Sequence, residues 1–266
     1  MRKFQANTII LGDCANALRN VPSASTQLII ADPPYNLGPQ FGNKKEWIHD
    51  SEWIEWCKEW LTECHRILQD DGNIFVYGIH HYMCYVQVLL YELGFKYRRQ
   101  IIWNYENGFS TYKRSLATHY EPLLWFSKTD TYAFIELREP YKSQERLKNK
   151  IVKNGKVWTP HPDGRIAGDV WAFPTLAGKR FSGEKVAHPT QKPLSITERI
   201  INHFSLPGEL VIAPFAGSGT ECVSALLNGR KYWGCELNPD YVDLATKRLA
   251  ATEAEMGLLE GQQPES

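Results

Sequence analysis

The sequence lacks any long hydrophobic run. Nowhere in its 266 residues does an apolar stretch approach the roughly 20 residues that a membrane-spanning helix needs. The first residues, MRKFQANTIILGD, show no apolar core followed by a small-residue cleavage site, so we expect no signal peptide. The six cysteines are scattered, without a Cys-x-x-Cys pair or a His/Cys cluster, which argues against a metal site and a disulfide framework. We therefore expect a cytoplasmic chain with no membrane contact.

The chain also lacks a net charge, because 30 Lys and Arg balance 30 Asp and Glu. The charge is unevenly spread: residues 138–192 hold twelve basic and five acidic side chains. A polyanionic partner would be attracted to this segment. A solvated, lysine-rich loop explains the same counts, so charge alone leaves both interpretations open.

Strand-like runs alternate with helix-length segments, which predicts an α/β fold with a largely parallel sheet covered by helices. Residues 51–68 form an amphipathic pattern in which Trp53, Trp56 and Trp60 recur at helical spacing, and we expect these side chains to pack in the core. Asp71-Gly72 is expected to form a turn. Seven segments read as strands: NTIILGD, TQLIIAD, NIFVYG, FKYRRQIIWN, YEPLLWFSK, ELVIA and KYWGCE.

The regular alternation breaks between residues 129 and 187, where periodicity fades and Gly and Pro become frequent. We interpret 129–187 as an inserted recognition region within one domain, whose two parts are 1–128 and 188–252. The polar end of the chain, 253–266, is expected to be a disordered tail.

The stretch IIADPPYNLG places Asp32 at the end of an apolar strand, followed by Pro33, Pro34 and Tyr35. Proline fixes φ and has no N–H to donate, so the chain leaves the sheet there as a stiff loop. A carboxylate, free carbonyl groups and an aromatic ring are thus presented together at the edge of the sheet where ligands bind in open α/β folds. A proline-rich turn with an Asp cap is the alternative interpretation.

A second ligand-binding edge is expected near the C-terminus. An apolar strand ends at Ala213, Gly217-Ser218-Gly219 opens a helix, and the next strand ends at Glu236. Glycines allow close approach of a ligand to the backbone, and a terminal acid can bind ribose hydroxyls. An ordinary tight turn that caps the helix is the alternative interpretation, but the combination of strand, glycine turn, helix, strand and terminal acid favours a nucleoside-containing cofactor. Because the loop lacks the full G-x-G-x-x-G pattern, a cofactor without phosphates is favoured over a dinucleotide.

Together, DPPY at 32–35, HPTQKP at 188–193 and FAGSGT at 215–220 resemble the motifs of amino-group DNA methyltransferases, in the order typical of the β group. The resemblance implies a Rossmann-like seven-stranded methyltransferase sheet, S-adenosylmethionine as cofactor, and double-stranded DNA as substrate. It assigns the catalytic role to Asp32, Pro33, Pro34 and Tyr35. It assigns cofactor contacts to Asp13, Cys14, Asp32, Thr190, Lys192, Phe215, Ala216, Gly217, Ser218, Gly219, Thr220, Glu236 and Asn238.

One position departs from the family pattern. Similar proteins usually have Asp where this chain has Ala213, and that carboxylate normally helps to orient the methionine amino group of the cofactor. Three explanations of this difference stay open: the loss of the carboxylate weakens cofactor binding, it is neutral drift, or it is a functional substitution. A DNA-binding relative with impaired catalysis therefore stays among the alternatives.

The resemblance also implies a mechanism. Asp32 and the Pro33 carbonyl accept hydrogen bonds from an exocyclic amine, and Tyr35 stacks on a base that has been flipped out of the duplex. Asp at the first motif position favours N6 of adenine as the target, with N4 of cytosine as the nearest alternative; an RNA substrate is a third. We expect Lys113, Arg114, Lys179 and Arg180 to contact DNA. A homodimer and a cognate restriction endonuclease are further expectations for such a bacterial, archaeal or phage protein.

Overall fold

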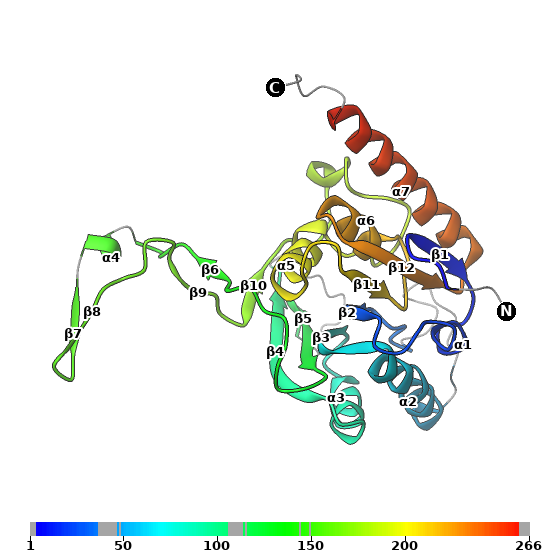
Figure 1. Ribbon diagram of the computed structural model, residues 1–266, viewed down its shortest axis with the longest axis horizontal. Helices are drawn as coiled ribbons and strands as arrows, with labels where there is room; N and C mark the ends of the chain where they lie inside the picture. Colours follow the sequence, from blue (N-terminus) through cyan, green and yellow to red (C-terminus); the bar gives the residue numbers. More distant parts are fainter. Residues whose placement is uncertain are drawn as a thin grey trace.

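A computed structural model describes residues 4–36, 47, 49–105, 114, 116–143, 145–148 and 150–260, and it is built around one large β-sheet (Figure 1). The sheet has eight strands in the spatial order β1-β12-β11-β2-β3-β5-β4-β10. Only β5 runs antiparallel to its neighbours within this sheet. In spatial order the strands are β1 (Thr8–Leu11), β12 (Lys231–Glu236), β11 (Leu210–Ala213), β2 (Thr26–Ala31), β3 (Leu68–Tyr77), β5 (Tyr120–Ser127), β4 (Lys96–Asn104) and β10 (Val170–Ala172).

The seven predicted strands are confirmed, and β10 adds an eighth from within the segment that was expected to be a separate insertion. β10 pairs with β4 in the register Val170↔Ile102. Trp171 lies at its centre and is 3% exposed, and its Nε1 donates a hydrogen bond to the Gly168 carbonyl at 2.9 Å. Burial of this large ring stabilises a strand that is too short to be recognised from its sequence pattern.

Helices cover both faces of the sheet (Figure 1). One face packs against α1 (Cys14–Leu18), α2 (Asp50–Ile67) and α3 (Met83–Glu92), and the other against α5 (Leu194–Phe204), α6 (Thr220–Leu227) and α7 (Pro239–Glu260). Successive strand residues point to opposite faces, so Ile212 joins the first hydrophobic cluster while Val211 and Ala213 join the second. The core is therefore divided into two layers by the sheet.

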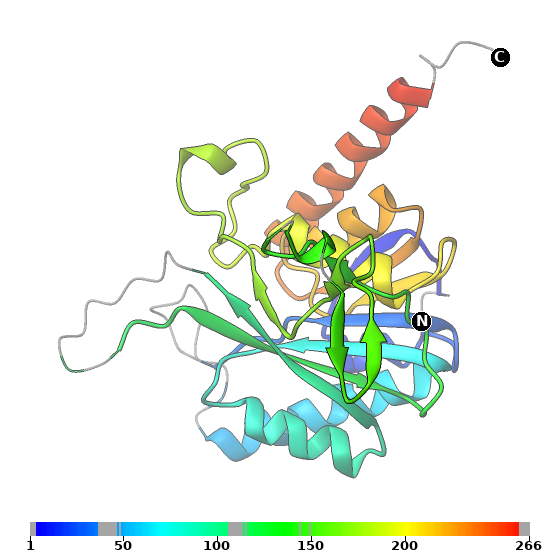
Figure 2. The same cartoon turned by 90° about the vertical axis from the view of Figure 1, so that its left-hand side faces the viewer.

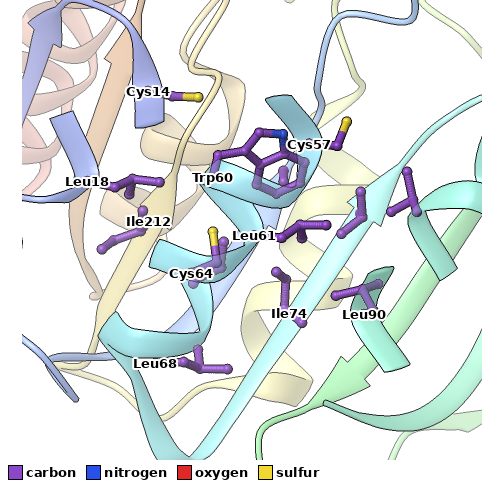
Figure 3. Packing of buried hydrophobic residues seen from close by; sticks show 14 of the residues in the cluster. Cys14, Leu18, Cys57, Trp60, Leu61, Cys64, Leu68, Ile74, Leu90 and Ile212 are labelled. Carbon is purple, nitrogen blue, oxygen red and sulfur yellow. The ribbon is translucent and has the colours of Figure 1, made fainter. Parts of the chain in front are cut away.

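The helix expected at 51–68 is observed as α2, and its tryptophans pack as predicted. Trp53 and Trp60 are buried, and Trp56 is partly buried against the same cluster. Figure 3 shows Trp60 and Cys64 of α2 among Leu18, Ile74 and Ile212. The stripe recurs every three to four residues because one face of the helix must lie against the sheet.

Within residues 129–187, the part from β6 (Arg138–Glu139) to β9 (Arg165–Ile166) leaves the body of the protein as an arm, whereas β10 lies in the central sheet (Figures 1 and 2). Along the arm, β6 pairs with β9, and β7 (Ile151–Lys153) pairs with β8 (Lys156–Trp158). Asn154 and Gly155 connect β7 to β8 with φ angles of 52° and 71°. Positive φ at both turn residues is what a two-residue hairpin requires, and Asn-Gly is suited to it. A short helix, α4 (Glu145–Lys148), precedes this hairpin.

Two local expectations are wrong. Asp71 and Gly72 lie inside β3 rather than in a turn, within a bulge where the pairing moves from Thr26↔Leu68 to Leu28↔Asn73. The bulge is held from outside, because Gln27 donates to the Asp71 carboxylate and Ala133 donates to the Asp71 carbonyl.

The chain from 253 to 260 is helical rather than disordered, because it continues α7. This stretch is rich in Ala, Glu, Leu and Met, which are strong helix formers. Residues 261–266 of the expected tail lie outside the described residues. Within the ranges described, no helix combines the length and the apolar character needed to cross a bilayer.

Replacing Trp60 by alanine should lower the free energy of unfolding by about 3–5 kcal/mol, because the cavity left between α2 and the sheet cannot collapse. Urea unfolding followed by circular dichroism measures this. The exposed neighbour Glu59 provides the control, since Glu59→Ala should stay within about 0.5 kcal/mol of the wild type. Equal effects of the two substitutions would contradict the core position of Trp60.

Candidate active site

The ends of several strands bring the motif residues to one edge of the sheet. β1, β12, β11, β2 and β3 are parallel neighbours, so the residues that follow them lie at the same edge. Asp13, the glycine loop 214–219 and Asp32 follow three of these strands, and Glu236 is the last residue of β12. The chain moves outward in opposite directions from β2 and β11, and such a switch point is where open α/β sheets bind ligands. The two motif regions predicted separately thus meet at one edge.

A buried lysine lies at the centre of this edge. Lys192 Nζ is 3.2 Å from Asp32 Oδ1, 3.0 Å from Glu121 Oε2 and 3.1 Å from Tyr35 Oη. The Tyr35 hydroxyl in turn donates a 2.5 Å hydrogen bond to Asp32 Oδ1. We call Asp32, Tyr35, Glu121 and Lys192 the Lys192 cluster.

The Lys192 side chain is 4% exposed and is also surrounded by aromatic rings. Its Nζ lies 5.1 Å from the ring centre of Tyr77, 5.4 Å from that of Tyr35 and 5.8 Å from that of Trp103. Burial by itself lowers the pKa of Lys192, but Asp32 and Glu121 outweigh burial and raise it above the usual value. Lys192 is therefore a permanent cation that holds one oxygen of Asp32 in place.

Burial, with Asp32 and Glu121 as further causes, raises the pKa of Tyr35 well above its usual value. Tyr35 thus remains a phenol and a hydrogen-bond donor at neutral pH. Trp53 of α2 fixes the next part of the loop, because its Nε1 donates to the Pro34 carbonyl at 2.9 Å. The tetrapeptide is held at both its carboxylate and its second proline.

Two acceptors of the tetrapeptide stay available. Among the described residues, no hydrogen bond or ion pair reaches Asp32 Oδ2 or the Pro33 carbonyl. Asp32 is partly exposed, with 18% of its side-chain surface accessible. The site can therefore accept two hydrogen bonds from a ligand that carries an NH₂ group.

The glycine loop adopts backbone conformations that require glycine. Gly217 and Gly219 have φ angles of 48° and 78°. A Cβ on Gly217 would lie 3.1 Å from His188 Nε2, and one on Gly219 would lie 2.8 Å from Ala245 Cβ. The second glycine lets α6 approach α7, and the first lets the loop approach His188 of the HPTQKP motif.

Glu236 ties the loop to the next strand. Its carboxylate accepts hydrogen bonds from the backbone N–H of Gly217 at 2.9 Å and of Asn238 at 2.8 Å. Asn238 Oδ1 accepts from the N–H of Asp240 at the start of α7. Asp13 caps α1 by accepting from the Asn16 N–H at 3.0 Å. Part of the hydrogen-bonding capacity of these polar residues is therefore used within the protein, to support this edge of the sheet.

Several predicted cofactor residues point into the protein. Cys14 is buried, and burial above all raises the pKa of its thiol, which stays neutral. Ser218 and Thr220 are buried with their hydroxyls 3.1 Å apart, beside Arg248 of α7. Phe215 packs its ring on Trp60, with 5.2 Å between ring centres. Ala216 is likewise buried.

A cavity of about 240 Å³ opens beside the Lys192 cluster. The residues that line it include Glu121, Thr190 and Lys192, and also Thr175, Leu176 and Ala177, which follow β10. The inserted segment therefore contributes directly to the wall of this cavity.

The predicted DNA contacts are distributed around this edge. Lys179 and Arg180 are exposed on a single turn of 3-10 helix, Lys179–Phe181, directly after the cavity-lining residues. Arg114 is exposed in the connection between β4 and β5. Lys113 lies outside the described residues.

Sequence reasoning missed several members of the site. Glu121 is the second residue of β5, and because β5 is antiparallel its start lies at the edge where β3 ends. Tyr77 and Trp103 lie at or next to the ends of β3 and β4. The YEPLLWFSK pattern predicted the strand but not its direction, so these neighbours could not be paired from sequence.

Comparison with known proteins gives the family of the chain. The sequence profile of a family described as DNA methylase matches residues 26–247. The chain is 34% identical over 254 residues to the type II methyltransferase M1.MboII of Moraxella bovis, covering 91% of this chain and 96% of that protein. It is 34% identical over 249 residues to the DNA adenine methyltransferase YhdJ of Escherichia coli (strain K12), covering 92% and 83%.

Two solved structures share the fold. The PvuII DNA methyltransferase, described as cytosine-N4-specific, has a TM-score of 0.70 at 20% identity and covers 92% of this chain and 87% of its own. The M1.HpyAVI–SAM complex has a TM-score of 0.62 at 22% identity, with coverage of 91% and 98%. With a profile match over most of its length and a DPPY loop that meets the glycine loop at one edge, the chain belongs to the DNA methylase family, as a β-group amino DNA methyltransferase.

Proposed function

We propose that this protein transfers a methyl group from S-adenosylmethionine to the N6 amine of a specific adenine in double-stranded DNA. The observation that carries the proposal is the pair of free acceptors, Asp32 Oδ2 and the Pro33 carbonyl, beside the Lys192 cluster. Asp at the first position of the tetrapeptide favours adenine, and a relative that is 34% identical is described as an adenine methyltransferase.

Unpartnered buried groups at the edge fit a polar, nucleoside-containing cofactor. Within the described part of the chain, Tyr77 Oη and His188 Nδ1 are buried without a hydrogen-bond partner. Buried polar atoms are rarely left unpaired unless a ligand or water completes them. Glu236, Asp13 and the loop of Gly217 would hold the adenosine part, and Thr190 and Lys192 the methionine side. When bound, S-adenosylmethionine supplies a methyl group on a positively charged sulfur.

The residues of this chain prepare the amine for attack. The lone pair of an exocyclic base nitrogen is delocalised into the ring, so the free amine is a poor nucleophile. Acceptance of its two N–H bonds by Asp32 Oδ2 and the Pro33 carbonyl favours a pyramidal nitrogen and stabilises the positive charge that develops on it. Asp32 Oδ2, or a water beside it, then takes the proton. Tyr35 and Lys192 keep the other Asp32 oxygen in position throughout.

The base must leave the duplex to reach these acceptors, which costs a few kcal/mol of unpairing. Tyr35 is suited to stack on the extruded ring, a contact worth about 1–3 kcal/mol. The cavity walled by Thr175, Leu176 and Thr190 adjoins Lys192 and Glu121, and we propose that the base enters from there.

We further propose that residues 129–187 read the target sequence, because this region is basic and its arm, from β6 to β9, reaches away from the sheet. Lys113, Arg114, Lys179 and Arg180 would contact phosphates or base edges. We also propose that the protein acts as a homodimer in the cytoplasm, and that a cognate restriction endonuclease accompanies it.

The product nucleoside tests the function. Duplex DNA incubated with the protein and S-adenosylmethionine should contain N6-methyladenine when its nucleosides are separated and weighed by mass spectrometry. N4-methylcytosine without N6-methyladenine would contradict the assignment of the base. Absence of both, with methylated nucleosides in structured RNA, would contradict the assignment of the substrate.

Asp32→Ala should abolish methyl transfer, with a loss of at least about 10²-fold, because one of the two acceptors of the target amine disappears. Binding of S-adenosylmethionine should be largely spared, since the glycine loop and Glu236 are untouched. Single-turnover kinetics and calorimetric titration measure the two effects separately. Near-normal turnover of the variant would contradict the proposed mechanism.

The double variant Lys179→Ala/Arg180→Ala should weaken binding to duplex DNA and reduce the slope of log K against log salt by about 2, one unit for each lost phosphate contact. Fluorescence anisotropy at several salt concentrations gives the slope. Lys96→Ala/Lys231→Ala is the matched control, because these exposed lysines begin β4 and β12 at the opposite edge of the sheet. Identical slopes for both double variants would exclude a contact by Lys179 and Arg180.

A further inference from the structure

A buried acid lies directly behind the glycine loop. Glu221 is the second residue of α6, follows Gly219 and Thr220, and is 4% exposed. In the part of the chain that the structure describes, no other residue donates a hydrogen bond to its carboxylate and no cation lies within ion-pair distance of it. Acidic side chains are almost never fully buried unless they are paired.

The charged groups that face Glu221 do not neutralise it. Asp32, Lys192 and Arg248 are near enough to affect its charge. Lys192 is already shared by Asp32 and Glu121, and Arg248 donates to the Ser218 carbonyl at 2.6 Å and to Thr220. The site therefore holds more negative than positive charge, which suits a cationic ligand.

Strand β11, which leads into the glycine loop, carries no acidic residue at its end. Ala213 ends β11, is 1% exposed, and points to the sheet face that α6 covers, where it packs in one cluster with Cys222 and Val223. Tyr77, whose hydroxyl has no partner among the described residues, points to that same face. A methyl group at 213 leaves this face without the carboxylate that the family pattern has there.

We propose that Glu221 binds the ammonium group at the methionine end of the cofactor, in place of the acid that is absent at Ala213. This inference rests on the proposed use of S-adenosylmethionine. On this inference the carboxylate that the family pattern has at position 213 of β11 is supplied by Glu221 of α6 instead. The site therefore remains able to bind the cofactor.

The pH dependence of binding follows from the surroundings of Glu221. Burial, and next Asp32, raise the pKa of Glu221 to about 7. A bound ammonium group favours the carboxylate and lowers this pKa again, so binding near pH 7 releases a proton. Of the other groups that face it, Tyr77 and Cys222 have raised pKa values and stay neutral, while Lys192 stays charged. Burial lowers the pKa of the nearby His188 below its usual 6.5, so its titration lies at lower pH.

Isothermal titration calorimetry of the full chain tests the proposal with three ligands. Glu221→Gln should weaken binding of both S-adenosylmethionine and S-adenosylhomocysteine about tenfold or more, since a charge-assisted hydrogen bond is lost. Methylthioadenosine has no ammonium group, so its affinity should not change. The double variant Ala213→Asp/Glu221→Gln should regain affinity. Glu255→Gln removes an exposed acid of α7 and serves as the control for net charge.

The wild-type protein gives a second readout that needs no variant. At pH 7 binding should release protons, measured from the change of binding enthalpy between buffers of different ionisation enthalpy. Release should vanish in Glu221→Gln and persist in Glu255→Gln. Unchanged affinity and proton count in Glu221→Gln, or a loss confined to S-adenosylmethionine, would overturn the inference while leaving the proposed function intact. No binding of S-adenosylmethionine to the wild type would instead overturn the proposed function.

Discussion

The Lys192 ammonium group lies in the protein interior between two carboxylates, a phenol and aromatic rings, and the active edge is organised around it. Moving such a cation out of water costs several kcal/mol unless opposite charges and hydrogen bonds compensate. Its partners come from distant parts of the chain: Glu121 is 71 residues away and Tyr35 is 157 residues away. The requirement to pair this one charge thus joins the loop after β2, the start of β5 and the loop before α5.

Helix α2 supports both halves of the edge from one side. Trp53 holds the Pro34 carbonyl of the tetrapeptide, and Trp56 and Trp60 pack against Phe215 of the glycine loop. A single rigid helix therefore sets the separation between the loop that would hold a base and the loop that would hold a methyl donor. Methyl transfer demands such fixed distances, because reacting atoms must be held within near-contact geometry.

Charge is divided unevenly between the body and the arm. The arm and the segment that follows it carry the excess of basic residues, whereas acids gather at the edge of the sheet in Asp32, Glu121, Glu221 and Glu236. A polyanion is attracted to the first and a cationic donor to the second, so the two substrates of a methyl transfer are drawn to adjoining but opposite electrostatic environments. The segment 175–177 is where these environments meet, because it leads from β10 to Lys179 and lines the cavity beside Lys192.

Local sequence by itself determined the strand and helix periods, seven of the eight strands of the sheet, and the two motif loops. Alternation, helical spacing and the stiffness of Pro33 and Pro34 all act within a few residues. Only the tertiary structure decided that β5 runs antiparallel and brings Glu121 to Lys192, that β10 joins the sheet around Trp171, and that Asp71-Gly72 forms a bulge rather than a turn. It also decided that Glu221 is buried with no hydrogen bond or ion pair from another residue of the described chain. These features depend on strand order and on charges paired across long separations, and neither leaves a periodic trace in the residues nearby.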